Sequence, residues 1–304
     1  MSQPWSPEVT VSPELARLLI VGQFPQLAPI AIESMGFGWD NTAYLANGRY
    51  VFRFPRRQLG ADCLECEIRV LPSLAPHLPL PIPNPTFIGT ATEQFAWLFA
   101  GYQRIEGRTA CSAPLDESQR TSAARPLGEF LAALHALDPR VAGEWGAPPD
   151  LLGRLEPTRR IPLAHKLLEE AAQLNLISDR ARYEWLIEET ATSRPPQATA
   201  LVHGDLYVRH ILVDCEARPS GIIDWGDVHL GDVALDLSIA HSFLPPSAHE
   251  TFRWAYGPID DATWRLARFR ALLYGLQLAK YGHLVADGDL RREGLWMLQN
   301  VIEQ

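Results

Sequence analysis

The sequence predicts an α+β protein in two parts, a β-rich first third and a mostly helical remainder. Short β-type runs separated by Gly and Asn turns fill the chain up to about residue 104, whereas apolar residues with helical spacing dominate from about residue 122. The chain has 304 residues, which is too long for one ordinary hydrophobic core and about right for two. We therefore expect two domains, over residues 1–104 and 105–304.

The first part is expected to open with a short helix followed by a β-hairpin. Ser12 suits a helix N-cap and Pro13 suits the first helical position, so a helix is expected up to about residue 21. Asn47 and Gly48 tolerate the positive φ angles of a tight hairpin turn. The strands predicted in this part cover residues 31–38, 41–45, 50–54, 86–89 and 95–102.

The strand expected over residues 50–54 alternates in character. Side chains of a strand point to opposite faces in turn, so one face of this strand is aromatic and the other carries Val51 and Arg53. The aromatic residues are Tyr50, Phe52 and Phe54. The two faces of this strand therefore differ in character.

A helix and an extended connector are predicted between the strands. Apolar spacing indicates a helix over residues 61–75, and Pro72 is expected to kink or end it. Residues 78–83 alternate leucine or isoleucine with proline, which removes amide donors and excludes a regular helix. We expect an extended segment there.

Beyond residue 107 the pattern becomes helical. Helices are predicted over residues 122–136 and 163–189, and again from Val233 almost to the end of the chain. Breaks in the last region are expected at Pro245-Pro246, Gly257-Pro258 and Asp287-Gly288. Three short strands are predicted over residues 198–202, 211–213 and 221–223, the last two forming a hairpin.

The charge balance limits the classes of partner. The formal net charge is -9, which argues against a nucleic-acid partner because phosphate backbones bind basic surfaces. The acidic excess would suit a cationic small substrate, or it serves solubility alone. We see no signal peptide and no run of 18 apolar residues, so we expect a cytoplasmic protein without a membrane partner. Cys63 and Cys66 have C-x-x-C spacing but lack the further ligands of a zinc site, which favours ordinary thiols.

The strongest chemical signal is a pair of acidic residues that each follow a short apolar strand. The strand at 198–202 leads into His203-Gly204-Asp205, and the hairpin at 211–223 leads into Asp224. Two carboxylates delivered in this way suit phosphoryl transfer, because one can orient and deprotonate a hydroxyl while the other holds Mg²⁺ against the phosphates.

The first part offers residues that complement this chemistry. Gly36 and Gly38 lie beside a strand end, where the absence of Cβ lets backbone approach a phosphate, although an isolated G-x-G is more often a plain turn. Arg53 is a candidate for contact with the α- and β-phosphates. Glu67 on the following helix, or alternatively Glu65, is a candidate partner that would hold the arginine in place.

Taken in order, these segments resemble the aminoglycoside and macrolide phosphotransferases, which share the two-lobed fold of protein kinases. The resemblance extends from about Ile30 to Tyr281, and its specific part is the segment from Leu201 to Asp236. It implies a nucleotide-binding lobe over residues 1–104 and a lobe over 105–304 that holds the catalytic loop and the acceptor site.

The resemblance also implies roles for individual residues. Asp205 would be the catalytic base and Asp224 the main Mg²⁺ ligand. Tyr102 and Arg104 would belong to the hinge, residues 102–105, whose backbone binds the purine of ATP or GTP. Asp232 resembles an aspartate that braces the catalytic loop.

One position departs from the usual family pattern. The residue five positions after Asp205 is His210, where the family usually has an asparagine that binds a second Mg²⁺. Imidazole is a poorer Mg²⁺ ligand than oxygen. Macrolide 2'-phosphotransferases also tend to carry histidine there, which leans the interpretation towards that subgroup. A metal-binding and a packed core histidine both remain open.

The leading hypothesis is an O-phosphotransferase that uses Mg²⁺ and ATP or GTP to phosphorylate a hydroxyl of an aminoglycoside or macrolide. A sugar, an amino alcohol or a hydroxy-amino acid is an alternative acceptor. A metal-dependent hydrolase is a second hypothesis, because several potential ligands are close in sequence: His203, Asp205, His210, Asp224, Asp227 and His229. A kinase-like binding module without activity is a third hypothesis.

For two other polar residues we favour a structural role. His203 is interpreted as a scaffold for the loop, and Asp236 as a helix-face or loop-bracing residue.

Overall fold

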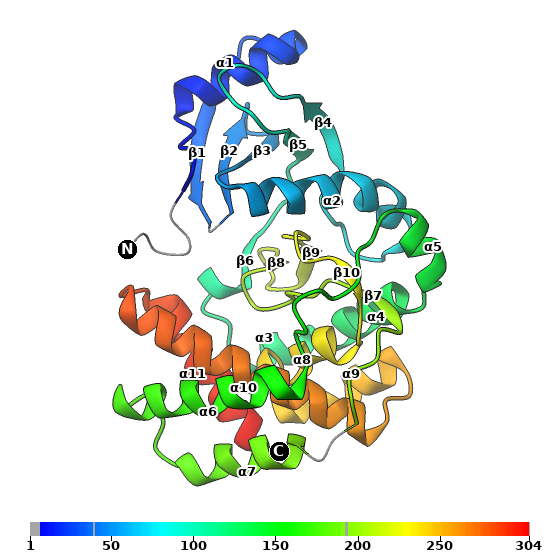
Figure 1. Cartoon of the computed structure of the whole chain (residues 1–304), viewed down its shortest axis with the longest axis vertical. Coiled ribbons are helices and arrows are strands. Elements are labelled where there is room, and N and C mark those ends of the chain that lie inside the picture. The colour runs from blue at the N-terminus through cyan, green and yellow to red at the C-terminus, as the bar shows by residue number, and fades with distance from the viewer. Residues whose placement is uncertain (1–6, 39, 192–193, 304) are drawn as a thin grey trace. The chain divides into compact units, whose positions relative to one another are not determined.

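A computed structural model describes residues 7–38, 40–191 and 194–303. The described chain divides into two compact units (Figure 1). The first unit extends to His77 and includes Pro81–Ile105 and Asp224–Asp227, and the second contains Leu78–Leu80, Glu106–Ile223 and the chain from Val228 onward. A β-sheet dominates the first unit and helices dominate the second, so the predicted α+β class is confirmed.

The first unit is built on a five-stranded antiparallel sheet with the strand order β1-β2-β3-β5-β4. The strands are β1 (Ile32–Phe37), β2 (Asn41–Ala46), β3 (Tyr50–Pro55), β4 (Pro85–Gly89) and β5 (Phe99–Gln103). Asn47 and Gly48 both have positive φ angles, 51° and 64°, as the hairpin prediction requires. The expected strand at 95–102 is only partly present, because Phe95 pairs back onto Thr92 in a tight turn and β5 begins four residues later.

Two helices pack on opposite faces of this sheet (Figure 1). Helix α1 (Pro13–Gln23) covers the aromatic face, where Phe52 and Phe54 of β3 lie fully buried. Helix α2 (Gln58–Leu74) covers the other face and begins three residues before the predicted start. Pro72 lies inside α2, which continues for two more residues and ends at Leu74, so the proline does not itself end the helix. Its ring has no N–H group, so the carbonyl of Ile68 lacks its usual helical donor. The remaining turns of 3-10 helix are η1 (Pro25–Leu27) and η2 (Ala75–His77).

The second unit is mostly helical. Its helices are η3 (Ala110–Ser112), α3 (Glu117–Ser122), α4 (Ala124–His135), α5 (Pro139–Glu144), α6 (Pro157–Gln173), α7 (Arg180–Ala191), α8 (Ala234–Ser242), η4 (Pro246–Ala248), α9 (His249–Tyr256), α10 (Asp261–Leu284) and α11 (Gly288–Ile302). Helix α10 is the centre of this unit, since it packs against α6, α8 and α11, while α9 packs against α4.

Small sheets carry the chemically interesting loops of the second unit. Strands β7 (Ala200–Val202) and β10 (His229–Gly231) form one antiparallel pair. Strands β6 (Arg108–Thr109), β8 (Ile211–Val213) and β9 (Pro219–Ile222) form another small sheet, in which β8 and β9 make the predicted hairpin. Strands β6 and β10 and helix α5 escaped prediction because they are too short to show a periodic pattern.

One predicted helix was wrong in its extent. The helix expected over 163–189 is two helices, α6 and α7, separated at Asn175, whose φ of 53° is incompatible with a continuous right-handed helix. The helix expected over 122–136 is confirmed as α4, and a short helix that was not predicted, α3, precedes it and begins with a capping box of Asp116 and Gln119. Within the described residues, no helix is long and apolar enough to cross a lipid bilayer.

Candidate active site

The first unit places Gly36 and Gly38 at the turn between β1 and β2. Gly36 has φ +95°, beside a register shift in β1, so its backbone adopts a conformation that favours glycine. A Cβ at either glycine would meet no atom of the described residues within 4 Å. The amide of Gly38 donates to the carbonyl of Asn41, and Arg56 donates to the carbonyl of Gly38. A phosphate contact by the Gly38 amide would therefore have to replace an existing bond, and the phosphate-binding role of both glycines stays a prediction.

Arg56 was missed by sequence reasoning. Its guanidinium lies 4.4 Å from the ring centroid of Phe37, which is 74% exposed at the tip of the same turn. No residue spacing signalled this contact, because Phe37 ends β1 and Arg56 follows β3, and strand β2 pairs with both of these strands.

Arg53 joins two carboxylates within the first unit. Its Nη1 donates to both carboxylate oxygens of Glu67 at 2.9 Å, and its Nη2 donates to Oδ1 of Asp224 at 2.8 Å. Glu67 is buried on α2, whereas the Asp224 side chain is 46% exposed. The pairing of Arg53 with Glu67, rather than with Glu65, agrees with the prediction. The contact with Asp224 was not expected from the sequence.

Tyr102 and Arg104 lie at the end of β5. The buried hydroxyl of Tyr102 donates to Oε2 of Glu67 at 3.1 Å, and burial together with the nearby Glu67 charge raises the pKa of Tyr102. The amide of Arg104 donates to the carbonyl of Arg49. Arg104 would thus reach a purine through its carbonyl or its side chain rather than its amide. The hinge role of both residues stays a prediction.

The catalytic-loop segment of the second unit follows β7 directly. Gly204 has φ +82°, which turns the chain sharply between His203 and Asp205. Imidazole Nδ1 of His203 accepts from the amide of Asp205, and its Nε2 lies 3.0 Å from the carbonyl oxygen of Ile223, to which it donates in this tautomer. Each ring nitrogen of His203 thus has a backbone partner, as expected of a scaffold residue.

The carboxylate of Asp236, on α8, holds the catalytic-loop segment through hydrogen bonds. This fully buried carboxylate accepts hydrogen bonds from the amides of His203 at 2.7 Å and Gly204 at 2.9 Å. His135 Nε2 lies 3.2 Å from its Oδ2. Burial alone would raise the pKa of Asp236, but the hydrogen bond from His135, the proximity of His203 and the Gly204 amide outweigh burial and hold the pKa below its usual value.

Asp232 does not brace the catalytic loop, contrary to the prediction. Its carboxylate accepts from Arg194, from the amide of Gln197 and from the amide of Ala234. It therefore fastens the segment before β7 to the start of α8. Asp236, for which loop bracing was one of two interpretations, accepts from the loop amides of His203 and Gly204, because it lies on α8 whereas Asp232 precedes that helix.

The carboxylate of Asp205 is partly accessible and has an aromatic neighbour. The hydroxyl of Tyr274, on α10, donates to Oδ1 of Asp205. The ring of Tyr274 is stacked on Tyr207, with centroids 5.5 Å apart and planes 14° apart. The Asp205 side chain is 31% exposed, so a hydroxyl group can reach it. Residue spacing does not indicate this contact, because the two residues lie 69 positions apart in the sequence.

His210 lies beside Asp205 in the same loop. Its Nδ1 donates to the backbone carbonyl of Asp205 at 2.8 Å and lies 3.7 Å from that residue's carboxylate. The ring is 8% exposed, and its edge contacts Tyr207, with centroids 4.4 Å apart. This packing accounts for the residue structurally, and Nε2 remains the nitrogen that a metal would use. Whether His210 binds metal stays a prediction.

Asp224 has an unusual backbone and a donor set suited to Mg²⁺. Its φ of +64° is rare for a residue with a Cβ and marks a strained position of the kind found at functional sites. A half-exposed carboxylate oxygen is the type of ligand that Mg²⁺ prefers, whereas the imidazole of His210 fits that ion less well.

The thiol of Cys63 is a structural group. Cys63 packs against Gly226, and burial together with neighbouring acidic groups raises the pKa of its thiol to about 12, so the thiol is inert.

The ligand cluster that the hydrolase hypothesis requires is not formed in the part of the chain that the structure describes. There, no three His, Cys, Asp or Glu side chains come together as a metal site. His203, one of the proposed ligands, already bonds backbone groups through each ring nitrogen. C-x-x-C residue Cys66 is buried in α2.

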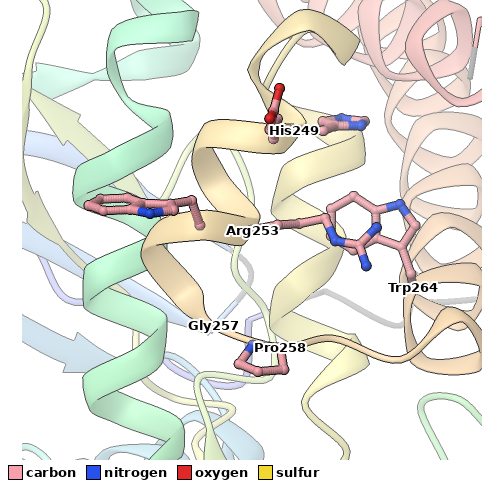
Figure 2. Close-up of a pocket in the computed structure, with 7 residues that line it drawn as sticks. His249, Arg253, Gly257, Pro258 and Trp264 are labelled. Carbon is pink, nitrogen blue, oxygen red and sulfur yellow. The ribbon is translucent and has the colours of Figure 1, made fainter.

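A separate cavity of about 690 Å³ lies between α9 and the start of α10 (Figure 2). Figure 2 shows Arg253 reaching towards the indole of Trp264, with His249 beside it. The guanidinium lies 5.1 Å from a ring centroid of Trp264 and donates to the carbonyl of Ile259. None of the predicted site residues lines this cavity.

A sheet unit with a paired strand arginine, a helical unit with a braced His-Gly-Asp loop, and an aspartate after the β8–β9 hairpin define a protein of the kinase-like fold. Residues 32–281 match the Phosphotransferase enzyme family, and the chain belongs to this family. The recognition made from the sequence is thereby confirmed.

Solved structures and a curated relative agree with this membership. The GDP and kanamycin complex of APH(2")-IIia is 27% identical, with a TM-score of 0.67 over 94% of this chain and 97% of that one. The macrolide 2'-phosphotransferase MphH from Brachybacterium faecium, as an apoenzyme, shares the fold at 24% identity, with a TM-score of 0.58 over 88% of this chain and 92% of that one. "Uncharacterized protein YcbJ" of Bacillus subtilis (strain 168) is 30% identical over 113 residues, which are 37% of this chain and 35% of that protein. The match thus spans about a third of that curated relative.

Proposed function

We propose that the protein transfers the γ-phosphate of ATP or GTP to a hydroxyl of a small molecule. The observation that carries this proposal is Arg53 on β3, paired with buried Glu67 on α2 and with the exposed carboxylate of Asp224. An ion pair between a strand cation and a helix glutamate is the device by which kinases hold the phosphates of the donor. The chain's membership of the phosphotransferase family supports the same reaction.

In this proposal each group has a separate task. Asp205 accepts the proton of the attacking hydroxyl, and Tyr274 fixes the direction of its carboxylate. Arg53 binds donor phosphate oxygens, with Gly36 and Gly38 approaching the phosphates and Tyr102 and Arg104 at the purine end. Asp224 would hold Mg²⁺, with His210 as a weaker candidate, and the ion would neutralise charge on the phosphates.

The first acceptors to test are aminoglycosides and macrolides. Kanamycin is bound in one similar structure, and a macrolide 2'-phosphotransferase shares the fold. A sugar, an amino alcohol or a hydroxy-amino acid is the alternative acceptor class. GDP in the kanamycin complex supports a nucleotide donor, and the choice between ATP and GTP is a matter for assay. The cytoplasmic location and the absence of nucleic-acid and membrane partners remain predictions.

The test is a panel of aminoglycosides, macrolides and small hydroxylated metabolites, scored for nucleoside diphosphate release with ATP and with GTP in the presence of Mg²⁺. Asp205→Ala should abolish turnover and keep nucleotide affinity, because the base does not contact the donor phosphates. Asp224→Ala should remove the Mg²⁺ dependence of nucleotide binding. Nucleotide binding without transfer to any acceptor would contradict the proposed reaction and favour a binding module.

A further inference from the structure

Four arginines gather where α6 begins and α10 passes in the second unit. Arg154 precedes α6, Arg159 and Arg160 lie in its first turn, and Arg270 lies on α10, which packs against α6. We call these four residues the arginine cluster. Burial and the positive charge of Arg270 lower the pKa of Arg160.

The cluster holds more positive charge than its acidic neighbour can neutralise. Asp150 pairs with Arg154 at 3.0 Å. Arg160 donates from Nε and Nη2 to the carbonyls of Gly153 and Leu152, and Arg159 donates to the carbonyl of Leu152. These bonds to neutral carbonyls orient the side chains without cancelling their charge. The excess is notable in a chain whose formal net charge is -9.

Arg270 is the member that most needs an external partner. It is 8% exposed, and its Nε is buried without a hydrogen-bond partner. Among the described residues, no carboxylate lies within ion-pair distance of its guanidinium, which instead lies over the ring of Tyr274 at 4.1 Å. Buried arginines in proteins are normally paired with an anion, because desolvating an unpaired charge is costly. The structure thus presents a guanidinium prepared for an anion that the chain does not provide.

Tyr274 connects this guanidinium to the candidate catalytic base. The face of the tyrosine ring contacts Arg270, and its hydroxyl donates to Oδ1 of Asp205. One aromatic side chain and one hydrogen bond therefore separate the two charged groups, which lie at most about 10 Å apart given ordinary hydrogen-bond lengths. A small acceptor whose hydroxyl meets Asp205 can extend over that distance.

We propose that Arg270, supported by Arg160, binds an anionic group, a carboxylate or a phosphate, on the acceptor whose hydroxyl meets Asp205. This inference rests on the proposed function and narrows its acceptor class. It favours a hydroxy acid or a phosphorylated alcohol over a polycationic aminoglycoside, which the cluster would repel. A guanidinium forms paired hydrogen bonds with planar carboxylates and with phosphates. An arginine at position 270 can therefore recognise the geometry of the anionic group as well as its charge.

The experiment compares matched probes that differ in the anionic group. Glycerate is compared with glycerol, and glucose 6-phosphate with glucose, by calorimetric titration of the wild-type protein and by phosphate transfer from ATP and GTP. We expect at least one anionic probe to bind about 10- to 100-fold more tightly than its neutral counterpart, as a charged hydrogen-bonded contact provides. The pair of probes that shows this difference then identifies the bound anionic group as a carboxylate or a phosphate.

Variants locate the site. Arg270→Gln should remove the preference for the anionic probe. If that variant does not fold, Arg160→Gln is tested in its place and should weaken the preference. Arg265→Gln, on the same helix with the same loss of charge, is the control and should keep the preference. Unfolding midpoints and nucleotide affinity show that each variant is folded.

The outcomes separate this inference from the proposed function. Anion binding that depends on Arg270, without transfer to any acceptor, would keep the site and reject the kinase reaction. Transfer to neutral or cationic acceptors, with no anionic preference in the wild type, would keep the reaction and overturn the site. An anionic preference that Arg270→Gln and Arg265→Gln reduce equally would also overturn it.

Discussion

The buried carboxylate of Asp236 accepts a hydrogen bond of 2.7 Å from the backbone amide of His203. A second bond, from Gly204, makes the carboxylate a bidentate acceptor for the turn that presents Asp205. His135 and, through it, the hydroxyl of Tyr256 extend the network to α4 and α9. The position of the candidate base is therefore fixed by α8 rather than by the strand that precedes it.

Replacing Asp236 by asparagine should destabilise the protein and impair transfer. The amide would turn an N–H group towards the two backbone donors, so at least one of them would lose its acceptor inside the protein. We expect a loss of about 2–4 kcal/mol in the free energy of unfolding, measured by denaturant titration. Asp261→Asn, in the exposed first turn of α10, is the control. An unfolding free energy equal to that of the control would remove Asp236 from this bracing role.

The same residue predicts a dependence of stability on acid. The pKa of Asp236 lies below its usual value of 3.8 in the folded protein, so its ionised form stabilises the fold. This contribution is complete above the unfolded-state pKa and is lost as the pH falls through the lower folded-state value. The difference in unfolding free energy between the wild type and Asp236→Asn should thus be constant near neutral pH and shrink below about pH 4. A difference that grows on acidification would have the wrong sign.

Replacing Arg53 by alanine should affect both stability and nucleotide use. Glu67 would be left as a buried carboxylate without its cation, which typically costs about 3–5 kcal/mol. The KM for the nucleotide should rise by about tenfold or more, because a charged phosphate contact is lost. Steady-state kinetics and thermal unfolding measure the two effects. The control is Arg17→Ala, at an exposed position of α1. If the nucleotide KM is unaltered, Arg53 is a structural residue and not a phosphate contact.

Replacing Tyr274 by phenylalanine tests how Asp205 is positioned. The ring keeps its stacking on Tyr207 and its contact with Arg270, whereas the donor to the carboxylate is removed. We expect kcat to fall by about tenfold and the nucleotide KM to remain within about twofold, since only an orienting hydrogen bond is lost. Tyr281→Phe, two turns further along α10, is the control. A variant that changes the nucleotide KM and leaves kcat unaltered would place Tyr274 outside the reaction.

Much of the fold was predictable because local patterns suffice for it. Alternation in β3 placed Phe52 and Phe54 in the core and Arg53 on the opposite face, and Asn47-Gly48 specified the hairpin. The division of residues 163–189 into two helices was not predictable in this way, since the apolar spacing continues through the break. Asn175 follows the C-cap of α6, and the amides of Asn175 and Leu176 donate back to the carbonyls of Ala172 and Ala171 in a turn that ends the helix.

The sequence by itself determined the order of the parts: a glycine turn, a strand arginine, a helix glutamate, a His-Gly-Asp loop and a following aspartate. Tertiary structure alone decided that Tyr274 contacts Asp205, that Asp232 bonds Arg194 and not the loop, and that Arg270 lies buried over the ring of Tyr274. The order of the motifs can be read from the sequence alone, because each motif is a short local pattern. Contacts between residues tens of positions apart depend on how helices α6, α8 and α10 pack, and packing is selected by the whole core rather than by any short segment.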